Sequence, residues 1–139
     1  MTDGLDQLLA DAGLNLLRAD TSLTVFDGAV PSPTPDPPYT CVYCTISWAF
    51  DPDSTALTGV VKRATVRWTV HSVGANSQAS RAVAQRVRTC LLNQRPTVAG
   101  MNTGLIRDDQ DSPPDPVRDE STGSLVVDSI HVYSLIATT

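Results

Sequence analysis

The stretch from Arg63 to Asn93 has the clearest pattern of hydrophobic and polar positions in the chain. Its first part alternates, and the apolar residues of one face are Ala64, Val66, Trp68 and Val70. A period of two is typical of a β-strand with one buried and one solvent-facing side. Beyond Val73-Gly74, apolar residues recur at three- and four-residue steps, namely Ala79, Val83, Val87 and Cys90. That spacing predicts an amphipathic helix, which is expected to lie on the sheet that contains the preceding strand.

Polar residues mark both ends of this helix. Asn76 or Ser77 is expected to cap its start, because a short side-chain oxygen accepts a hydrogen bond from a free N–H group of the first turn. Asn93 followed by Pro96 marks its end, since proline cannot continue a helix. We therefore place the central helix between these two signals.

Two more long strands are predicted. The segment Tyr39 to Phe50 alternates, and one of its faces consists of Val42, Cys44, Ile46, Trp48 and Phe50. If it pairs with the strand that holds Trp68, then Trp48 and Trp68 should both lie under the central helix. The segment Ser124 to Ile136 has apolar residues on both faces. Such a strand is expected to be covered on both sides, by a helix layer or by a neighbouring subunit.

The N-terminal residues predict a second helix. Asp3 can cap it, and its apolar residues at helical spacing are Leu5, Leu8, Leu9, Ala12 and Leu16. Gly13 is expected to weaken or end this helix, because glycine costs about 1 kcal/mol in a helix interior. Asp27-Gly28 predicts a turn. Short strands or connectors are predicted at residues 23–26, 98–101 and 104–107.

These elements together predict one α+β domain over residues 1–139. We expect a mixed, mostly antiparallel β-sheet of four to five strands, with the N-terminal helix and the central helix packed on it. A chain of 139 residues is long enough to bury a sizeable core as one domain. It has no run of about 18 apolar residues that would span a membrane, and residues 1–20 lack the basic start of a signal peptide. We therefore expect a protein made and used in a cytosol.

Two loops are prominent in the sequence. Residues 29–38 contain five prolines, which cannot donate hydrogen bonds to a β-ladder and favour an extended backbone. We expect an ordered surface loop or arm there, and a proline-rich ligand for a separate recognition domain is the alternative. Residues 51–62, with Asp51 and Asp53, form a loop of the length that is often functional or interfacial.

Acidic residues dominate the charge of the chain. A net charge of −5 argues against tight, sequence-specific binding of nucleic acid, but it is compatible with a surface past which DNA slides. Carboxylates gather in an acidic loop at residues 108–122, which includes Asp108, Asp109 and Asp111. An EF-hand loop that starts at Asp108 needs glycine at its sixth position, where this chain has Pro113. A solvated loop, a weak ion site and an acidic surface facing a charged partner all remain open.

The residues that usually do chemistry are scattered. Cys41 and Cys44 are three apart on a predicted strand, so they point to opposite faces and cannot easily bind one ion. We expect them and Cys90 to be free, buried thiols. His71 and His131 lie in strand patterns without a nucleophile motif, and no G-x-S-x-G, phosphate-binding glycine loop or H-E-x-x-H occurs. We therefore predict neither an enzyme nor a cofactor or metal site.

The central helix has a polar face opposite Val83. Arg81 and Arg88 are seven residues apart on it, and Gln85 lies between them. This face is either simply solvated or pairs with an acidic loop of an adjacent copy. The second hypothesis follows because complementary patches on different parts of one surface suit head-to-tail ring closure.

The order of these pieces points to a family. The N-terminal helix is followed by Val25-Phe26-Asp27-Gly28 and Pro31, and Pro38-Tyr39 leads into a β-rich run. A strand then runs into a helix after Val73-Gly74. Near the end, Arg107-Asp108-Asp109 precedes Gly123 and a closing strand with Val132-Tyr133. In this order the chain resembles, over nearly its whole length, the tail terminator proteins of long-tailed phages with non-contractile tails, the lambda-like type. The loops at 31–38 and 108–120 look longer than the family minimum.

The resemblance implies a structural role in a virion. Tail terminators form a hexameric ring on the last ring of the tail tube, stop its polymerisation and offer the surface where the filled head docks. The implied partners are copies of the chain itself, the major tail tube protein, head-closure or connector proteins, and DNA that passes through the ring without specific binding. The implied interface residues are Arg81, Gln85 and Arg88. The implied channel or docking residues are Asp51, Asp53, Asp108, Asp109 and Asp111.

Three alternatives stay open at this point, one of which is a chaperone or regulator. The nearest is another neck component, a head-closure or connector protein, which is also small, mixed in fold and ring-forming. An alternative of a different class is a small ligand-binding domain, which would be a monomer with a deep polar pocket.

Overall fold

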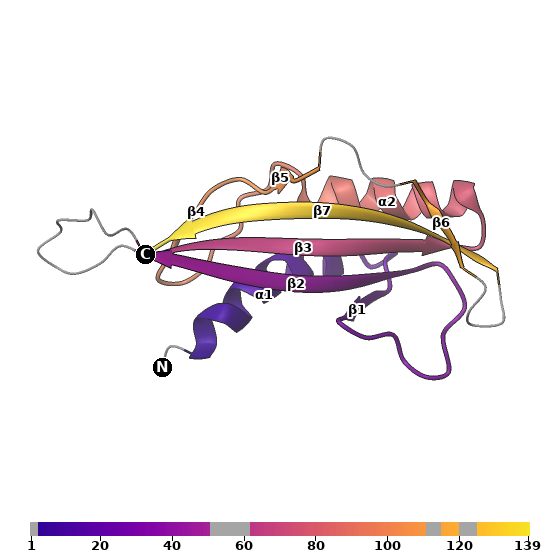
Figure 1. Ribbon diagram of the computed structural model, residues 1–139, viewed down its shortest axis with the longest axis horizontal. Coiled ribbons are helices and arrows are strands. Elements are labelled where there is room, and N and C mark those ends of the chain that lie inside the picture. Colours follow the sequence, from indigo (N-terminus) through magenta and orange to yellow (C-terminus); the bar gives the residue numbers. More distant parts are fainter. Residues whose placement is uncertain (1–2, 51–61, 111–114, 120–124) are drawn as a thin grey trace, which may run out of the picture.

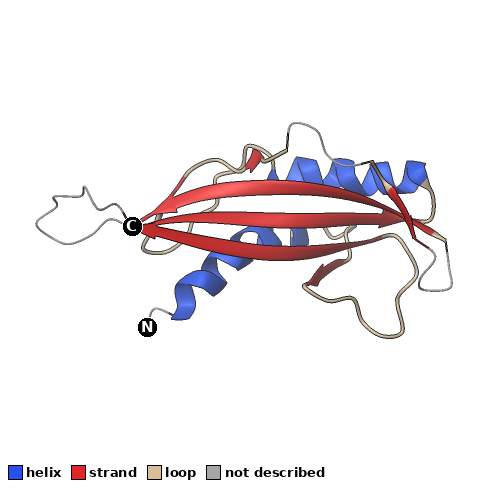
Figure 2. Cartoon of the chain, viewed as in Figure 1, coloured by secondary structure: helices blue, strands red, loops and turns tan. Residues whose placement is uncertain are grey.

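The computed structural model describes residues 3–50, 62–110, 115–119 and 125–139. Its elements, drawn in Figure 1 and coloured by type in Figure 2, are α1 (Asp3–Arg18), β1 (Val25–Asp27), β2 (Tyr39–Phe50), β3 (Lys62–Gly74), α2 (Ser77–Leu91), β4 (Asn102–Thr103), β5 (Arg107–Asp108), β6 (Val117–Asp119) and β7 (Val126–Thr138). The predicted loop residues Asp51, Asp53 and Asp111 lie outside the described residues.

One sheet organises the molecule. Its strand order is β1-β2-β3-β7, and the short strands β4, β5 and β6 all pair with the outer edge of β7. The three long strands are mutually antiparallel and β1 is parallel to β2, so the predicted α+β fold with a mixed, mostly antiparallel sheet is confirmed. Among the described residues the sheet has seven strands, more than the four to five predicted. The predicted acidic loop accounts for part of this difference, because it contains β6 and its first residue, Asp108, ends β5.

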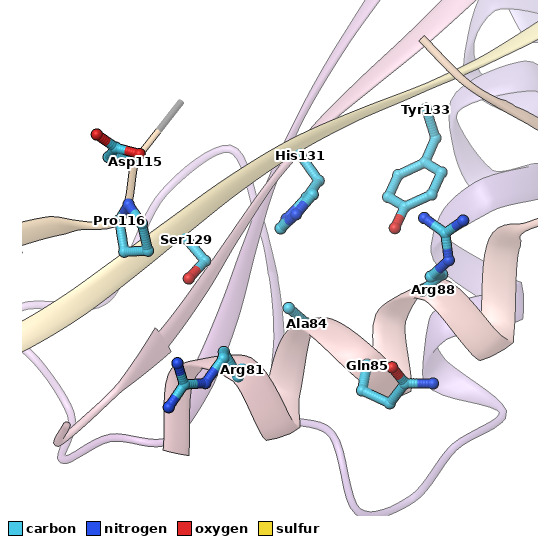
Figure 3. A pocket seen from close by; sticks show the side chains of 9 residues that line it. All are labelled: Arg81, Ala84, Gln85, Arg88, Asp115, Pro116, Ser129, His131 and Tyr133. Atoms are coloured by element: carbon cyan, nitrogen blue, oxygen red, sulfur yellow. The ribbon is translucent and has the colours of Figure 1, made fainter. Parts of the chain in front are cut away.

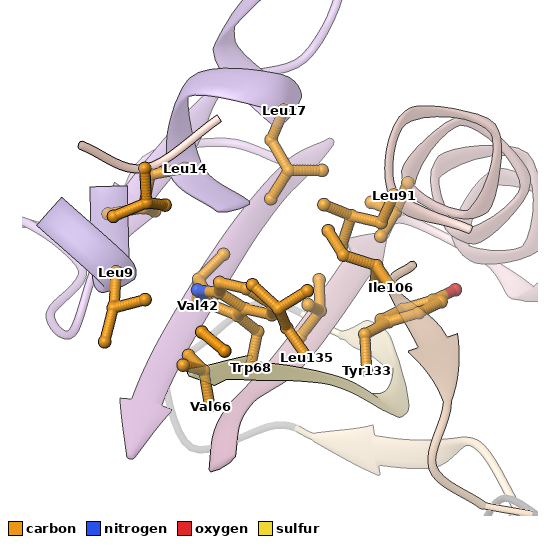
Figure 4. Close-up of a cluster of buried hydrophobic side chains, with 14 of the residues drawn as sticks. Leu9, Leu14, Leu17, Val42, Val66, Trp68, Leu91, Ile106, Tyr133 and Leu135 are labelled. Atoms are coloured by element: carbon orange, nitrogen blue, oxygen red, sulfur yellow. The ribbon is translucent and has the colours of Figure 1, made fainter. Parts of the chain in front are cut away.

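Both helices pack on the same face of the sheet, behind the long strands in the view of Figure 1. In the middle of that face, Trp68 of β3 lies between Cys44 of β2 and Tyr133 of β7 in the register. The alternating residues Ala64, Val66, Trp68 and Val70 are all fully buried, as their pattern predicts. Figure 4 shows the core around Trp68, with leucines of both helices above the strands.

Helix α1 continues through Gly13, contrary to the prediction that this glycine weakens or ends it. A Cβ atom on Gly13 would lie 2.5 Å from Cε2 of Trp68, so only glycine lets the helix approach the indole this closely. The Trp68 Nε1 group donates a hydrogen bond to the carbonyl of Ala10 at 3.2 Å. The Nε1 group of Trp48 donates to Oδ1 of Asp6 at 2.8 Å. Both tryptophans thus lie under α1 and not, as predicted, under α2.

In each helix, the buried residues differ in part from those predicted. In α1, Leu14 and Leu17 are fully buried, whereas Leu8 is 44% exposed. The close contact at Gly13 turns this face of the helix toward the sheet. In α2 the buried residues are Ser80, Val83, Val87 and Leu91, so Val83 and Val87 are confirmed. Asn76 caps α2, as predicted, because its side-chain oxygen accepts a hydrogen bond from the Ala79 amide at 2.8 Å.

The second face of the sheet is only partly covered within the chain. At one end, Tyr39, Val73 and Val126 form a small buried cluster against which Phe26 and Val30 pack. Farther along the same face, Tyr43 is 46% exposed and Ile136 is 52% exposed. The prediction that the last strand is covered on both sides therefore holds, among the described residues, for the helix face and for one end of the other face.

Candidate functional site

A pocket of about 440 Å³ opens between α2 and β7, and we call it the α2–β7 pocket. Its lining residues are Arg81, Ala84, Gln85 and Arg88 of α2, Ser129, His131 and Tyr133 of β7, and Asp115 and Pro116 before β6. Figure 3 shows the β7 side chains in a row facing the helix. Polar and charged groups from three separate segments thus converge on one hollow.

Local periodicity places most of these residues. Arg81, Gln85 and Arg88 are four and three residues apart, so they are neighbours on one flank of α2. The β7 residues Ser129, His131 and Tyr133 are two apart and share one face of the strand. The structure therefore brings together all three residues that were predicted for a subunit interface. The sequence analysis missed the contribution of β7, although its alternation already placed His131 and Tyr133 on one side.

A buried hydroxyl network fixes the floor of the pocket. Ser80 Oγ of α2 donates to the carbonyl of Ser72 at 2.8 Å and lies 2.7 Å from Ser129 Oγ. Because the single hydroxyl hydrogen of Ser80 goes to that carbonyl, Ser129 is the donor in the second bond. Ser129 is therefore left with acceptor capacity only. The network ties the first turn of α2 to both β3 and β7.

Arg88 is already paired within the chain. Its Nη1 lies 3.0 Å from Oδ2 of Asp108, and Arg88 lines the pocket together with Tyr133. The pKa of Tyr133 is raised to about 12, chiefly by burial and also by the charge of Asp108, while Arg88 partly offsets these two effects. The phenol is therefore neutral at ordinary pH and its hydroxyl stays available for hydrogen bonding.

Arg81 differs from Arg88 in this respect. It is exposed, and it has no hydrogen bond or ion pair to any of the residues that the structure describes. Asp115 lines the same pocket from the side before β6, where Figure 3 shows its carboxylate well apart from the Arg81 guanidinium. The α2–β7 pocket therefore presents a guanidinium without a partner among the described residues, beside hydrogen-bonding groups, which suits a carboxylate or another anionic group.

The predicted acidic residues lie on different faces. Asp108 pairs with Arg88 on the helix side, whereas Asp109 accepts a hydrogen bond from Nε of Arg67 at 2.9 Å on the other face. On that other face His71 Nδ1 also lies 2.7 Å from Oδ2 of Asp128. Asp108 and Asp109 therefore do not form one carboxylate cluster, because adjacent residues of an extended segment point to opposite sides.

The three cysteines are free, as predicted, but only Cys41 is buried, and Cys44 and Cys90 are half-buried. Cys41 and Cys44 point to opposite faces, as predicted. Burial raises the pKa of Cys41, and it raises that of Cys44 to about 11, so both are thiols and weak nucleophiles at neutral pH. Among the described residues, no group of three or more His, Cys, Asp or Glu side chains could hold a metal ion. In the same residues, no helix is both long and apolar enough to cross a membrane.

Comparison with solved structures finds a likeness in fold. No protein-family model and no curated protein matches the chain. Its fold is similar to that of a chain in the solved structure described as "Virion of native gene transfer agent (GTA) particle". The two chains are 17% identical, the TM-score is 0.68, and the match covers 97% of this chain and 98% of the other. The chain therefore shares, over nearly its whole length, the fold of a chain in a gene transfer agent particle.

Proposed function

We propose that this chain is a structural protein of a phage-like virion, and specifically a tail terminator. In this role it assembles as a ring on the last ring of the tail tube, stops the polymerisation of the tube and provides the surface where the head docks. The end-to-end likeness to a virion chain supports this proposal most directly. The order of sequence elements, which resembles the lambda-like terminators, supports it independently.

The physical features of the chain suit such a role. Part of one sheet face, including Tyr43 and Ile136, is left exposed by the chain itself and is available to another subunit. The net charge of −5 lets DNA pass without adhering. Among the described residues, neither His71 nor His131 is hydrogen-bonded to a serine, threonine or cysteine, so the described site offers binding groups without an activated nucleophile.

Electron microscopy of the purified protein, alone and mixed with tail tubes, tests this proposal. We expect annular particles that sit at one end of each tube and prevent further growth. Native mass spectrometry gives the number of copies, for which the resemblance implies six. Binding to connector rings without binding to tubes would assign the chain to the head-closure or connector proteins instead. A monomer that binds neither would contradict a place in the neck.

Charge reversal tests the predicted role of Arg88 at the subunit interface. We expect Arg88→Glu to weaken ring assembly. Because Arg88 also pairs with Asp108 in its own chain, the double variant Arg88→Glu/Asp108→Arg is the matched control. Assembly restored by the double variant would assign the defect to the pair within the chain. Unchanged assembly of Arg88→Glu would remove Arg88 from the interface.

The α2–β7 pocket favours a second candidate, a small ligand-binding domain. Its volume is within the range of about 300–1,000 Å³ that is common for such sites. This candidate predicts a monomer at every concentration whose melting temperature rises with added phosphate or citrate, since a ligand that binds only the folded state stabilises it. Ring formation without any effect of these anions would reject it.

A further inference from the structure

The sheet has two very different edges. Residues 29–38, which we call the proline arm, connect β1 to β2 at one edge, and the α2–β7 pocket lies at the opposite edge beside β7. Figure 1 shows the arm as a wide loop on the β1 side and α2 on the far side of the long strands. We propose that the proline arm of one copy docks in the α2–β7 pocket of a second copy. This inference rests on the assembly of copies suggested under the proposed function.

The proline arm is exposed and conformationally restricted. Most of it is exposed, including Pro31, Pro33 and Asp36. Its five prolines hold the backbone in a narrow range of φ, so little conformational entropy remains to be lost on docking. At its base, Val30 packs against the buried cluster of Tyr39, Val73 and Val126. The arm is thus a stiff loop attached firmly to the body at one end.

The α2–β7 pocket matches the arm in chemistry. Proline-rich segments dock in grooves lined by aromatic side chains, and Tyr133 supplies one here. Here Ala84 and Pro116 supply apolar surface, and Gln85 and His131 supply polar groups. A volume of about 440 Å³ accommodates a few side chains, which fits the tip of a loop better than a whole helix.

The charged residues of the arm and the pocket indicate how the arm is oriented when it docks. Asp36 is the only charged residue of the proline arm, and it is exposed. Arg81 lacks a partner in the described part of its own chain, and a guanidinium forms strong, directional bonds with a carboxylate. Asp115 in the pocket repels a second carboxylate, and Arg88 is held by Asp108. The carboxylate of Asp36 is therefore assigned to the Arg81 side of the pocket.

The positions of the proline arm and the pocket at opposite edges of the sheet also bear on the symmetry of the assembly. Because the proline arm connects β1 to β2 at one edge of the sheet and the pocket lies beside β7 toward the other edge, we place the arm in the pocket of another copy. Each copy then offers an arm on one edge and accepts one on the other. Such a head-to-tail contact generates a ring when the rotation closes and an open filament when it does not.

A charge swap in the full-length protein tests the inference. We expect Asp36→Arg and Arg81→Asp each to weaken assembly about tenfold or more, measured as the concentration at which native mass spectrometry shows half of the chains assembled. The double variant Asp36→Arg/Arg81→Asp should recover most of this loss. Matched controls are Asp27→Arg, on β1 outside the arm, and Arg86→Asp, on α2 outside the pocket, which should leave assembly nearly unchanged.

A disulfide trap gives a second readout that does not depend on the strength of assembly. In the variant Asp36→Cys/Arg81→Cys, mild oxidation should link separate copies into a ladder on a non-reducing gel, and each single cysteine variant should give at most pairs. The docking inference would be overturned if the wild type forms rings, the double charge variant does not recover assembly and no ladder appears. That result would leave the proposed function standing. A wild-type monomer without a ladder would overturn both.

Discussion

Gly13 is the residue on which the contact between α1 and the sheet depends. Its missing side chain makes room for the Trp68 ring, which is fully buried. We expect Gly13→Ala to lower the free energy of unfolding by about 1–3 kcal/mol, because the new methyl group overpacks the core and the indole cannot move aside. Denaturation with urea, followed by tryptophan fluorescence, measures this loss.

Gly4 in the same helix is the matched control for Gly13. A Cβ atom at Gly4 would meet no atom within 4 Å. Gly4→Ala should therefore leave the stability unchanged or raise it by up to about 1 kcal/mol, since alanine favours the helix more than glycine does. Equal effects of the two substitutions would show that helix propensity, and not the contact with Trp68, sets the response.

Tyr133 is expected to make the stability of the protein depend on pH. Its pKa is raised from 10.0 to about 12, chiefly by burial, so the folded protein keeps this proton at a pH where the unfolded chain loses it. The stability that the neutral phenol contributes is thus complete below pH 10 and is lost as the pH rises toward 12. Ultraviolet titration of phenolate should show a late step that is absent in Tyr133→Phe. A titration without a late step would mean that Tyr133 is solvated.

At the scale of elements, α2 depends on its cap. The Asn76 side chain satisfies the Ala79 amide, which otherwise has no partner in the first turn. We expect Asn76→Ala to cost about 1 kcal/mol of stability, measured by thermal or chemical denaturation. Asn15→Ala, at an exposed position inside α1, is the control and should be neutral or slightly stabilising. A loss of similar size in the control would argue against the capping role.

The elements that the sequence predicts well are those with a long local pattern. The observed bounds of β2, Tyr39–Phe50, are the predicted ones, and β3 extends the predicted segment by one residue at each end. The strands β4, β5 and β6 have only two or three residues each, which is too short for a period to show. They exist because β7 offers an edge with free backbone groups to the segments that pass beside it.

At the scale of the whole molecule, the excess of acidic residues predicts how the protein behaves toward DNA. With a net charge of −5, the protein should not retard duplex DNA in a gel, even at low salt where attraction between charges is strongest. Retardation that disappears as salt is added would instead reveal a basic surface strong enough to outweigh the net charge. The result bears directly on the proposed passage of DNA through a ring.

The sequence by itself determined the α+β class, the long strands and the capped central helix, because each depends on a pattern repeated over neighbouring residues. It also placed Arg81, Gln85 and Arg88 on one flank of that helix. Only the tertiary structure decided that α1 covers the tryptophans and that these three residues meet His131 and Tyr133 in one pocket. Such contacts join residues far apart in the chain, and they depend on strand register and on which helix can approach the sheet closely.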